Sequence, residues 1–219
     1  MKIINFKSPP KNNWFAPEWN YYVFESKLEK INFKKLSTYL LKKEKDLLKL
    51  PNTIKQNKYS DGYTGLGKNS TTSRYDKYNV LKWDNKEISL IKKQIISFHN
   101  SILKKFNFQP VEALYAQCWV NIMRKGQSIK PHLHSVSPNC YFGGHICVQA
   151  EDTSTYYINP INQISDPETF KSKNEIGKIT IFQNNMPHYT DTHVGNKERI
   201  TIAFDLSLIK QSDNEIKLI

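Results

Sequence analysis

From about residue 111 onward the chain consists of short runs of β-branched and aromatic residues separated by Gly, Pro and Asn. The runs are ALYAQCWVNIM, FGGHICVQ, STYYINP, GKITIFQN and RITIAFDLSL. Their length and punctuation predict the strands of a sandwich or barrel, and no helical period of useful length interrupts them. This half of the chain most constrains the fold, because its strands must bury one face against another layer.

The first half has a different texture. Apolar residues recur at helical spacing from Ser26 to Leu50 and again from about Glu87 to Phe106. NYYVFES reads as a short strand before them, and residues 1–19, which contain three prolines, are predicted to be irregular. Helices followed by strands indicate an α+β fold with the helices packed on one sheet. We expect residues 1–110 to support a core formed by 111–219 within one domain.

A segment rich in Gly, Ser, Thr and Tyr, YSDGYTGLGKNSTTSRYDKYNV, separates the two helical patterns at residues 59–80. Two interpretations stay open: a long surface loop, or a lid near a functional site, since loops of this length tend to be functional.

The formal net charge of +12 comes from 29 lysines and three arginines against 20 acidic residues. The lysines are scattered without a long basic block, so we predict a solvated surface; a nucleic-acid-binding module remains an unfavoured alternative. Arginine differs from lysine because its planar fork can hold a carboxylate with two bonds. Arg74 and Arg124 are expected to bind an anionic part of a substrate or, more commonly, to form structural ion pairs.

Cys118, Cys140 and Cys147 form no CxxC pair and no even disulfide framework, which fits a reducing compartment. Cys118 and Cys147 are expected to be buried as small hydrophobic residues. No run of eighteen apolar residues and no export signal is found, so we predict a cytoplasmic protein without a membrane partner.

Three of the six histidines lie between residues 132 and 145. If IKPHLHS is extended, His132 and His134 project to the same side and can offer two imidazoles to one metal ion. His188, in NMPHYT, is the natural third ligand. A pair at i and i+2 with one distant residue has the layout of a facial triad that leaves coordination positions open. Arg199 and Thr201 share a face of the strand RITIAFDL and can together hold a small dicarboxylate.

The remaining histidines have weaker claims on function. His145 either faces the cavity or packs in the sheet. His193, in TDTHVGN, is expected to be a surface imidazole in a turn, and His99 a structural histidine of the second helix, on the surface or in the core.

The segments GQSIKPHLH, GKITIFQNNMPHYT and RITIAFDL together resemble the core of the iron(II)- and 2-oxoglutarate-dependent oxygenases over about residues 115–207. The resemblance is closest to the prolyl-hydroxylase-like and "putative 2OG-Fe(II) oxygenase" groups, many of them from bacteriophages. It implies a double-stranded β-helix, or jelly roll, and for a phage-encoded protein a place in the host cytoplasm.

Carried over position by position, the resemblance makes His132 the first iron ligand and His188 the distal one. It assigns 2-oxoglutarate binding to Arg199 and Thr201, with O2 as the oxidant. On the strand with Gln117, Trp119 and Tyr115, Asn121 is a candidate contact for the keto-acid end of the cosubstrate.

His134 departs from the family pattern, which has a carboxylate at this position. If His134 ligates iron, hydroxylation is expected. If it swings away, chloride or water takes its place, as in relatives that halogenate or use two histidines. We favour ligation.

The resulting prediction is a dioxygenase that hydroxylates a C–H bond, first of all in a protein or peptide residue. A free amino acid, a nucleotide or a small metabolite stays open as substrate, and the oligomeric state is not predicted. The alternatives are a cupin-like metal protein that does not use 2-oxoglutarate and the basic nucleic-acid-binding module.

Overall fold

Two antiparallel sheets form the framework of the protein, which is a computed structural model describing residues 1–52, 64–135, 139, 141–161 and 168–219. The larger sheet has seven strands, in the order β1 (Lys2–Lys7), β2 (Asn20–Lys27), β7 (Lys178–Gln183), β4 (Phe142–Gln149), β9 (Arg199–Ser207), β3 (Tyr115–Met123) and β10 (Ile216–Lys217). The smaller sheet has the order β6 (Thr169–Lys173), β5 (Ser154–Ile158) and β8 (His188–Thr190).

The five strands predicted after residue 111 are confirmed as β3, β4, β5, β7 and β9. Three further strands were not predicted. β8 and β10 have only three and two residues, too few for any alternation to show, and β6 has the polar sequence TFKSK. β4 lies between β7 and β9, so the strands of the second half interleave in space rather than following one another.

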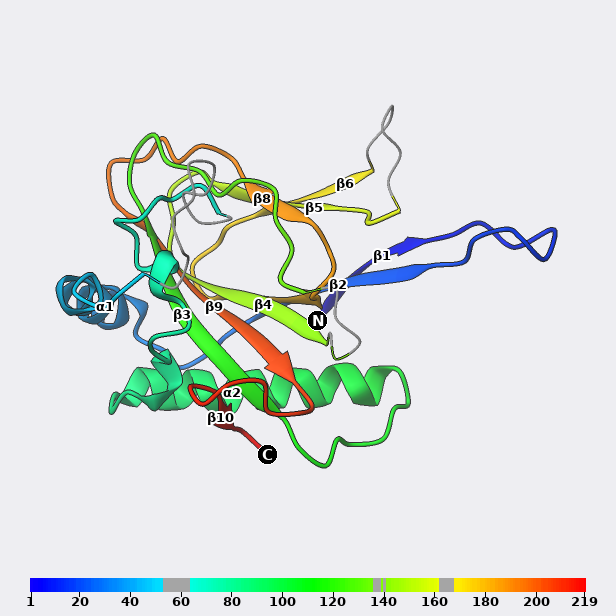
Figure 1. The fold of residues 1–219 in the computed structure, drawn as a ribbon, viewed down its shortest axis with the longest axis horizontal. Helices are drawn as coiled ribbons and strands as arrows, with labels where there is room; N and C mark the ends of the chain where they lie inside the picture. The colour runs from blue at the N-terminus through cyan, green and yellow to red at the C-terminus, as the bar shows by residue number, and fades with distance from the viewer. Residues whose placement is uncertain (53–63, 136–138, 140, 162–167) are drawn as a thin grey trace.

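The expectation that residues 1–19 are irregular is wrong in part, because Lys2–Lys7 pairs along its whole length with β2. The two strands project from the body as a narrow ribbon (Figure 1), and the prolines fall in the turn region between them. At the far end Trp14 and Phe15 are each 97% exposed. β2 continues into the large sheet through β7, so the first half of the chain adds strands as well as helices to this layer.

Two helices accompany the large sheet: α1 (Phe33–Leu47) and α2 (Lys86–Lys105). Asn32 and Asn85 cap their N-termini through side-chain oxygens, and Ser26–Lys27 of the predicted first helix belongs instead to β2. Figure 1 shows α2 running along one side of the large sheet. Buried apolar residues of both helices and of β3, β4, β7 and β9 form one hydrophobic cluster.

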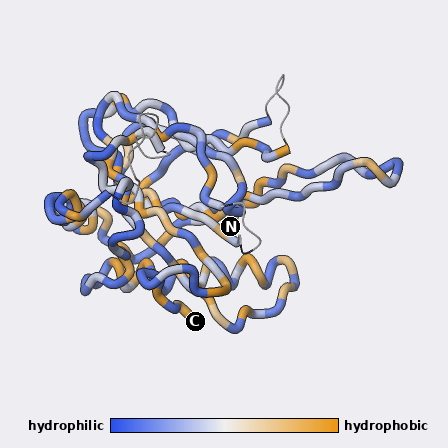
Figure 2. The backbone as a smooth tube through the Cα atoms, in the orientation of Figure 1, coloured by the Kyte–Doolittle hydropathy of each residue, from blue (hydrophilic) through white to orange (hydrophobic). Residues whose placement is uncertain are grey.

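Figure 2 shows that apolar residues concentrate in α2 and the adjacent strands, whereas the loops beside β8 are mainly hydrophilic. Two short 3-10 helices, η1 (Thr72–Arg74) and η2 (Val80–Lys82), link α1 to α2. Cys118 and Cys147 are buried as expected, and Cys140 lies outside the described residues. Within the described part of the chain, no helix has the length and apolar character needed to cross a membrane.

Candidate active site

A cavity of about 640 Å³ is lined by residues of both sheets. β3, β4 and β9 of the large sheet form one wall, and β5 and β8 of the small sheet contribute Thr155, His188 and Thr190. The segment before α2 adds residues 64, 72, 73 and 75, and Pro131 to His134 complete the lining. The sheets therefore enclose a site to which distant parts of the chain contribute.

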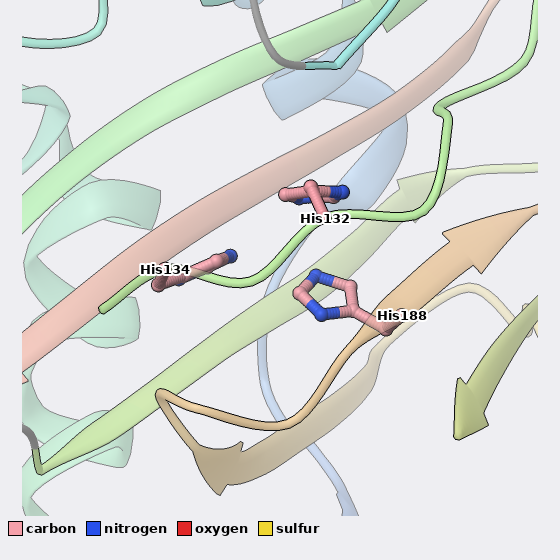
Figure 3. Close-up of side chains that lie close together, drawn as sticks. All are labelled: His132, His134 and His188. Atoms are coloured by element: carbon pink, nitrogen blue, oxygen red, sulfur yellow. The ribbon is translucent and has the colours of Figure 1, made fainter. Parts of the chain in front are cut away.

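The three predicted ligands gather in this cavity (Figure 3). One ring nitrogen each of His132, His134 and His188 lies within 4.8 Å of the others. The ring centroids of His132 and His188 are 4.3 Å apart, and that of His134 lies 5.6 Å from His132 and 5.0 Å from His188. His188 is the first residue of β8, and an isolated antiparallel bridge joins it to His132.

Each of these imidazoles has an acceptor at Nδ1. The Nδ1 of His132 donates to the carbonyl of Lys130 (2.9 Å), and that of His188 donates to the carbonyl of Met186 (3.0 Å). The Nδ1 of His134 contacts the carboxylate of Asp205. Because an acceptor at Nδ1 holds the proton there, Nε2 of each ring keeps its lone pair, which is the arrangement a metal ligand needs.

Burial favours the neutral rings that metal binding requires. Burial, assisted by the neighbouring His134, lowers the pKa of His132 to about 4. Burial, with His132 and His134 nearby, holds the pKa of His188 well below its ordinary value. At neutral pH both rings are therefore neutral imidazoles, the form that can bind a metal ion, rather than imidazolium ions.

The donor set fits a divalent first-row transition metal. Three neutral imidazoles suit iron, zinc, copper or nickel, and three protein ligands leave positions open for other molecules. His134 replaces the carboxylate of the usual facial triad, so the ligand set itself carries no negative charge. The described residues thus offer a metal site of three nitrogens on one side of a cavity.

Arg199 lies on the same cavity wall and is 2% exposed. Its guanidinium donates to Met123 Sδ (3.0 Å) and Thr155 Oγ1 (3.4 Å), and no carboxylate of the described residues forms an ion pair with it. Burial lowers the pKa of Arg199, although arginine remains protonated under ordinary conditions. The Asp191 carboxylate acts on Arg199 only over a longer distance, so a buried cation that faces a cavity and makes no direct ion pair is suited to an anionic ligand.

Thr201 and Asn121, predicted to bind the cosubstrate, also line the cavity and face each other across the β3–β9 pair. The amide oxygen of Asn121 accepts from Thr72 Oγ1 (2.6 Å), which fixes the side chain. Trp119 lines the cavity too, and its ring lies 5.6 Å from that of Tyr75. The face predicted for β3 is therefore the cavity face, although Gln117 and Tyr115 do not reach the cavity.

Gln117 binds the segment that precedes α2 to β3. Its amide donates to the carbonyls of Tyr75 (2.5 Å) and Tyr78 (2.8 Å), so the segment before α2 covers this part of β3. Residues 59–63 of the predicted loop lie outside the described residues, but Thr64, Thr72 and Tyr75 line the cavity. The described part of the loop therefore forms part of the cavity wall.

Arg74 and Arg124 both serve the structure. Arg74 is buried and donates to the carbonyls of Leu48, Leu50, Lys68 and Ser70, which ties the loop to the end of α1. The expected ion pair is therefore wrong for Arg74, because main-chain oxygens take its donors. Arg124 forms a two-bonded pair with Glu44 of α1, at 2.9 and 2.8 Å.

Of the other histidines, His145 lines the cavity and His99 does not. His145 lines the cavity from β4, its Nε2 bonds with Tyr157 Oη (2.7 Å), and its buried Nδ1 has no partner among the described residues. Burial, with Arg199 as the next cause, lowers the pKa of His145 to about 3. His99 is buried against Tyr141, away from the cavity.

His193 corrects the expectation of a surface imidazole, since it is 0% exposed. Its main chain bonds with Gln127 and Gly126, and its Nε2 contacts the carbonyl of Lys197 at 2.5 Å. The polar sequence TDTHVGN suggested a solvated turn, but in the structure the imidazole of His193 is buried.

Asp205 is the site residue that the sequence reasoning missed. It lies on β9 at even spacing from Arg199, Thr201 and Ala203, and all four line the cavity. The alternation of a strand was the available signal: once Arg199 and Thr201 were placed on the inner face, position 205 belonged there too.

Comparison with known proteins supports this picture. Residues 117–205 match the model of a family described as "Putative 2OG-Fe(II) oxygenase". No curated protein sequence matches the chain significantly.

Solved structures share the fold at low sequence identity. A Pseudomonas putida prolyl-4-hydroxylase is 7% identical, with 84% of this chain and 91% of that chain covered and a TM-score of 0.53. AviO1 from Streptomyces viridochromogenes is 9% identical, with 84% and 89% covered and a TM-score of 0.56. The α-ketoglutarate-dependent epimerase SnoN of nogalamycin biosynthesis is 7% identical, with 84% and 76% covered and a TM-score of 0.54.

The matched region contains His132, His134, His188 and Arg199. The resemblance read from the sequence is therefore confirmed: this region matches a 2OG-Fe(II) oxygenase family, within a fold similar to that of a prolyl-4-hydroxylase.

Proposed function

We propose that the protein is an iron(II)- and 2-oxoglutarate-dependent dioxygenase that hydroxylates a C–H bond, with His132, His134 and His188 as metal ligands. One observation carries the proposal: the buried guanidinium of Arg199, without a carboxylate partner among the described residues, shares a cavity with the three imidazoles. A buried guanidinium that makes no ion pair is costly unless an anion binds to it, and a dicarboxylate cosubstrate would supply that anion.

In this proposal the chain's residues bind and orient the cosubstrate. Arg199 would hold the C5 carboxylate of 2-oxoglutarate, and Thr201, two residues along β9, would contact the same end. Asn121 is held by Thr72 through its amide oxygen, and its amide nitrogen would be available to the keto-acid end. Iron(II) with bound 2-oxoglutarate would supply activation of O2, coupled to decarboxylation of the cosubstrate.

The cavity walls supply exclusion of water. Trp119 and Tyr75 cover one side of the histidine cluster, Trp119 with its ring centroid 5.7 Å from that of His134. Phe182 packs against His188 at 4.5 Å. Aromatic side chains around a ligand set keep the reacting groups away from bulk water and strengthen the electrostatic interactions inside.

We further propose that the two sheets are the two faces of a double-stranded β-helix formed by residues 111–219. Residues 1–110 would then be its support within the same domain. The antiparallel pairing of both sheets and the addition of β1 and β2 to the larger one support this assignment.

Ligation by His134 is favoured over an open position. The main-chain N–H of His134 donates to the carbonyl of Asn184 (2.9 Å), and the ring contacts Asp205 through Nδ1, beside His132 and His188. A ring oriented in this way would occupy the position that a halide needs, which favours hydroxylation over halogenation.

The substrate assignment is a residue of a protein or peptide. The similar fold of the Pseudomonas putida prolyl-4-hydroxylase supports it. The epimerase SnoN has a similar fold at a comparable TM-score, so a small metabolite is the second candidate.

Anaerobic titration tests the proposal. Apo-protein receives iron(II) and then 2-oxoglutarate, and the visible charge-transfer band of the chelate is followed. We expect a band that disappears in Arg199→Ala and requires His188, and slow succinate formation when air is admitted. Iron binding without any effect of 2-oxoglutarate would instead indicate a cupin-like metal protein.

The basic nucleic-acid-binding alternative makes an opposite prediction. Tight binding of nucleic acid, steeply dependent on salt and unchanged by His188→Ala, would support it. The formal charge of +12 is the feature that suggests this alternative.

A further inference from the structure

One of the three imidazoles is oriented differently from the other two. His132 and His188 donate from Nδ1 to main-chain carbonyls, whereas His134 contacts the side-chain carboxylate of Asp205. The main chain of the segments 130–132 and 186–188 therefore orients two rings. Only His134 depends on a side chain for its orientation at Nδ1.

The surroundings of His134 fit this contact closely. A Cβ built on Gly143 would lie 2.8 Å from Nδ1 of His134, so the absence of a side chain at Gly143 lets the ring approach β4. The side chain of His134 is 7% exposed and that of Asp205 is 29% exposed. Asp205 lines the same cavity as His134 and lies at the opposite end of the β9 row from Arg199.

We propose that Asp205 is the positioning residue for His134 and supplies, from behind the ring, the negative charge that the ligand set lacks. A carboxylate at Nδ1 fixes the tautomer with Nε2 unprotonated and raises the basicity of Nε2. In the family pattern a carboxylate is itself a metal ligand. Here His134 stands at that position, and the carboxylate of Asp205 lies behind it, in contact with its Nδ1. This inference rests on the proposed metal centre.

A competing role is available to the same carboxylate. Asp205 lines the cavity and is partly exposed, so it has the access needed to bind a donor group of the substrate directly. The two roles differ in one respect: a positioning residue affects the metal through His134, even when no substrate is present.

Cobalt(II) binding to the apo-protein, without 2-oxoglutarate, distinguishes the positioning role of Asp205 from the substrate-binding role. The measured quantities are the dissociation constant and the visible spectrum of bound cobalt(II), for wild type, Asp205→Asn, His134→Ala and the double variant. Asparagine keeps the size and one oxygen of aspartate, removes the charge and replaces the second oxygen by an NH2 donor. We expect Asp205→Asn to weaken binding by about 10–100-fold, the usual effect of losing a partner behind a metal-bound histidine.

The coupling between the two sites is the decisive result. In the His134→Ala background the Asp205→Asn change should have a several-fold smaller effect, because the contact with a metal ligand is gone and only the longer-range charge of Asp205 still acts on the cluster. Equal losses in both backgrounds, or unchanged binding in Asp205→Asn alone, would overturn the inference. Asp205→Ser repeats the measurement if thermal melting shows that the asparagine variant is unfolded.

Asp191→Asn is the matched control. The Asp191 carboxylate accepts two bonds from the amide of Ser154, at 2.9 and 3.0 Å, and is close in sequence to His188, but no histidine of the cluster contacts it. Its removal should leave cobalt(II) affinity within about twofold of wild type. Failure of the wild-type protein to bind cobalt(II) would overturn the metal centre itself, whereas binding without coupling overturns only the role of Asp205.

Discussion

The main-chain amides of His132 and His188 each donate to the other's carbonyl oxygen, at 3.0 and 2.9 Å. This reciprocal pair joins a loop to the first residue of β8 and brings the two rings to a centroid separation of 4.3 Å. Two of the three proposed ligands are thus placed by backbone geometry.

Metal binding should stabilise the protein and chelation should reverse the effect. At a free metal concentration about 100 times the dissociation constant the gain is about 2.7 kcal/mol, equivalent to roughly 5–10 °C in Tm for a chain of this size. His188→Ala should abolish the shift, as followed by thermal melting with manganese(II). His99→Asn alters a buried histidine outside the cavity, so it should lower Tm but keep the shift; its loss there would argue against the assigned cluster.

Arg199→Met should abolish 2-oxoglutarate binding without destabilising the apo-protein. Methionine is unbranched and apolar like the stem of arginine, and replacing a buried charged group by an apolar side chain is often neutral or stabilising. Calorimetric titration should show at least a 100-fold loss of 2-oxoglutarate affinity, and urea unfolding an unchanged or higher stability. Arg124→Gln, which breaks only the pair with Glu44, should leave the affinity unchanged. A large loss of apo stability in Arg199→Met would assign Arg199 a structural role.

Gly143→Ala should lower metal affinity, whereas Gly144→Ala should lower the stability of the fold. A Cβ at Gly143 would lie 2.8 Å from both His134 Nδ1 and Asn184 Oδ1, whereas one at Gly144 would lie 2.4 Å from the Phe204 ring and 2.6 Å from the carbonyl of Thr180. We expect Gly143→Ala to weaken metal binding by displacing His134. Gly144→Ala should destabilise the fold by about 1–3 kcal/mol through overpacking. Metal titration and urea unfolding of both variants measure the two effects. Equal changes in metal affinity and in unfolding free energy for the two variants would contradict this distinction.

Stability of the apo-protein should fall as the pH drops below about 6.5. The folded-state pKa is about 4 for His132 and about 3 for His145, against an ordinary value of 6.5. Below pH 6.5 the unfolded chain therefore binds protons that the folded chain does not, and the folded state loses roughly 2 kcal/mol per imidazole at pH 5. Urea unfolding at pH 7 and pH 5 measures the loss. His145→Gln should reduce it by about the share of one imidazole, and an unreduced loss would count against the buried neutral ring.

The sequence predicted several residues that line the cavity because side chains two positions apart tend to share a face. Arg199 and Thr201 follow this rule on β9, whereas His132 and His134 line the cavity from a loop with a single β-bridge at His132 rather than from a strand. His188 was identified by its motif, and its meeting with His132 depends on a long-range bridge that no local pattern encodes. Family resemblance supplied that last step.

Other features required tertiary structure. β1 was missed because prolines after it suggested irregularity, while its pairing with β2 decides its conformation. The burial of His193 results from a turn closed by backbone bonds to Gly126 and Gln127, partners that a polar sequence does not reveal. The contact between Asp205 and His134 joins residues 71 positions apart.

Main-chain orientation of His132 and His188 has a consequence for how the site tolerates change. No substitution at Lys130 or Met186 removes the carbonyl that holds either ring, so these two ligands are robust to mutation of their nearest partners. His134 alone can be retuned by exchanging one side chain behind it. Directed evolution toward another metal or another reaction outcome should therefore accumulate its changes around position 205 and spare the neighbours of the other two histidines.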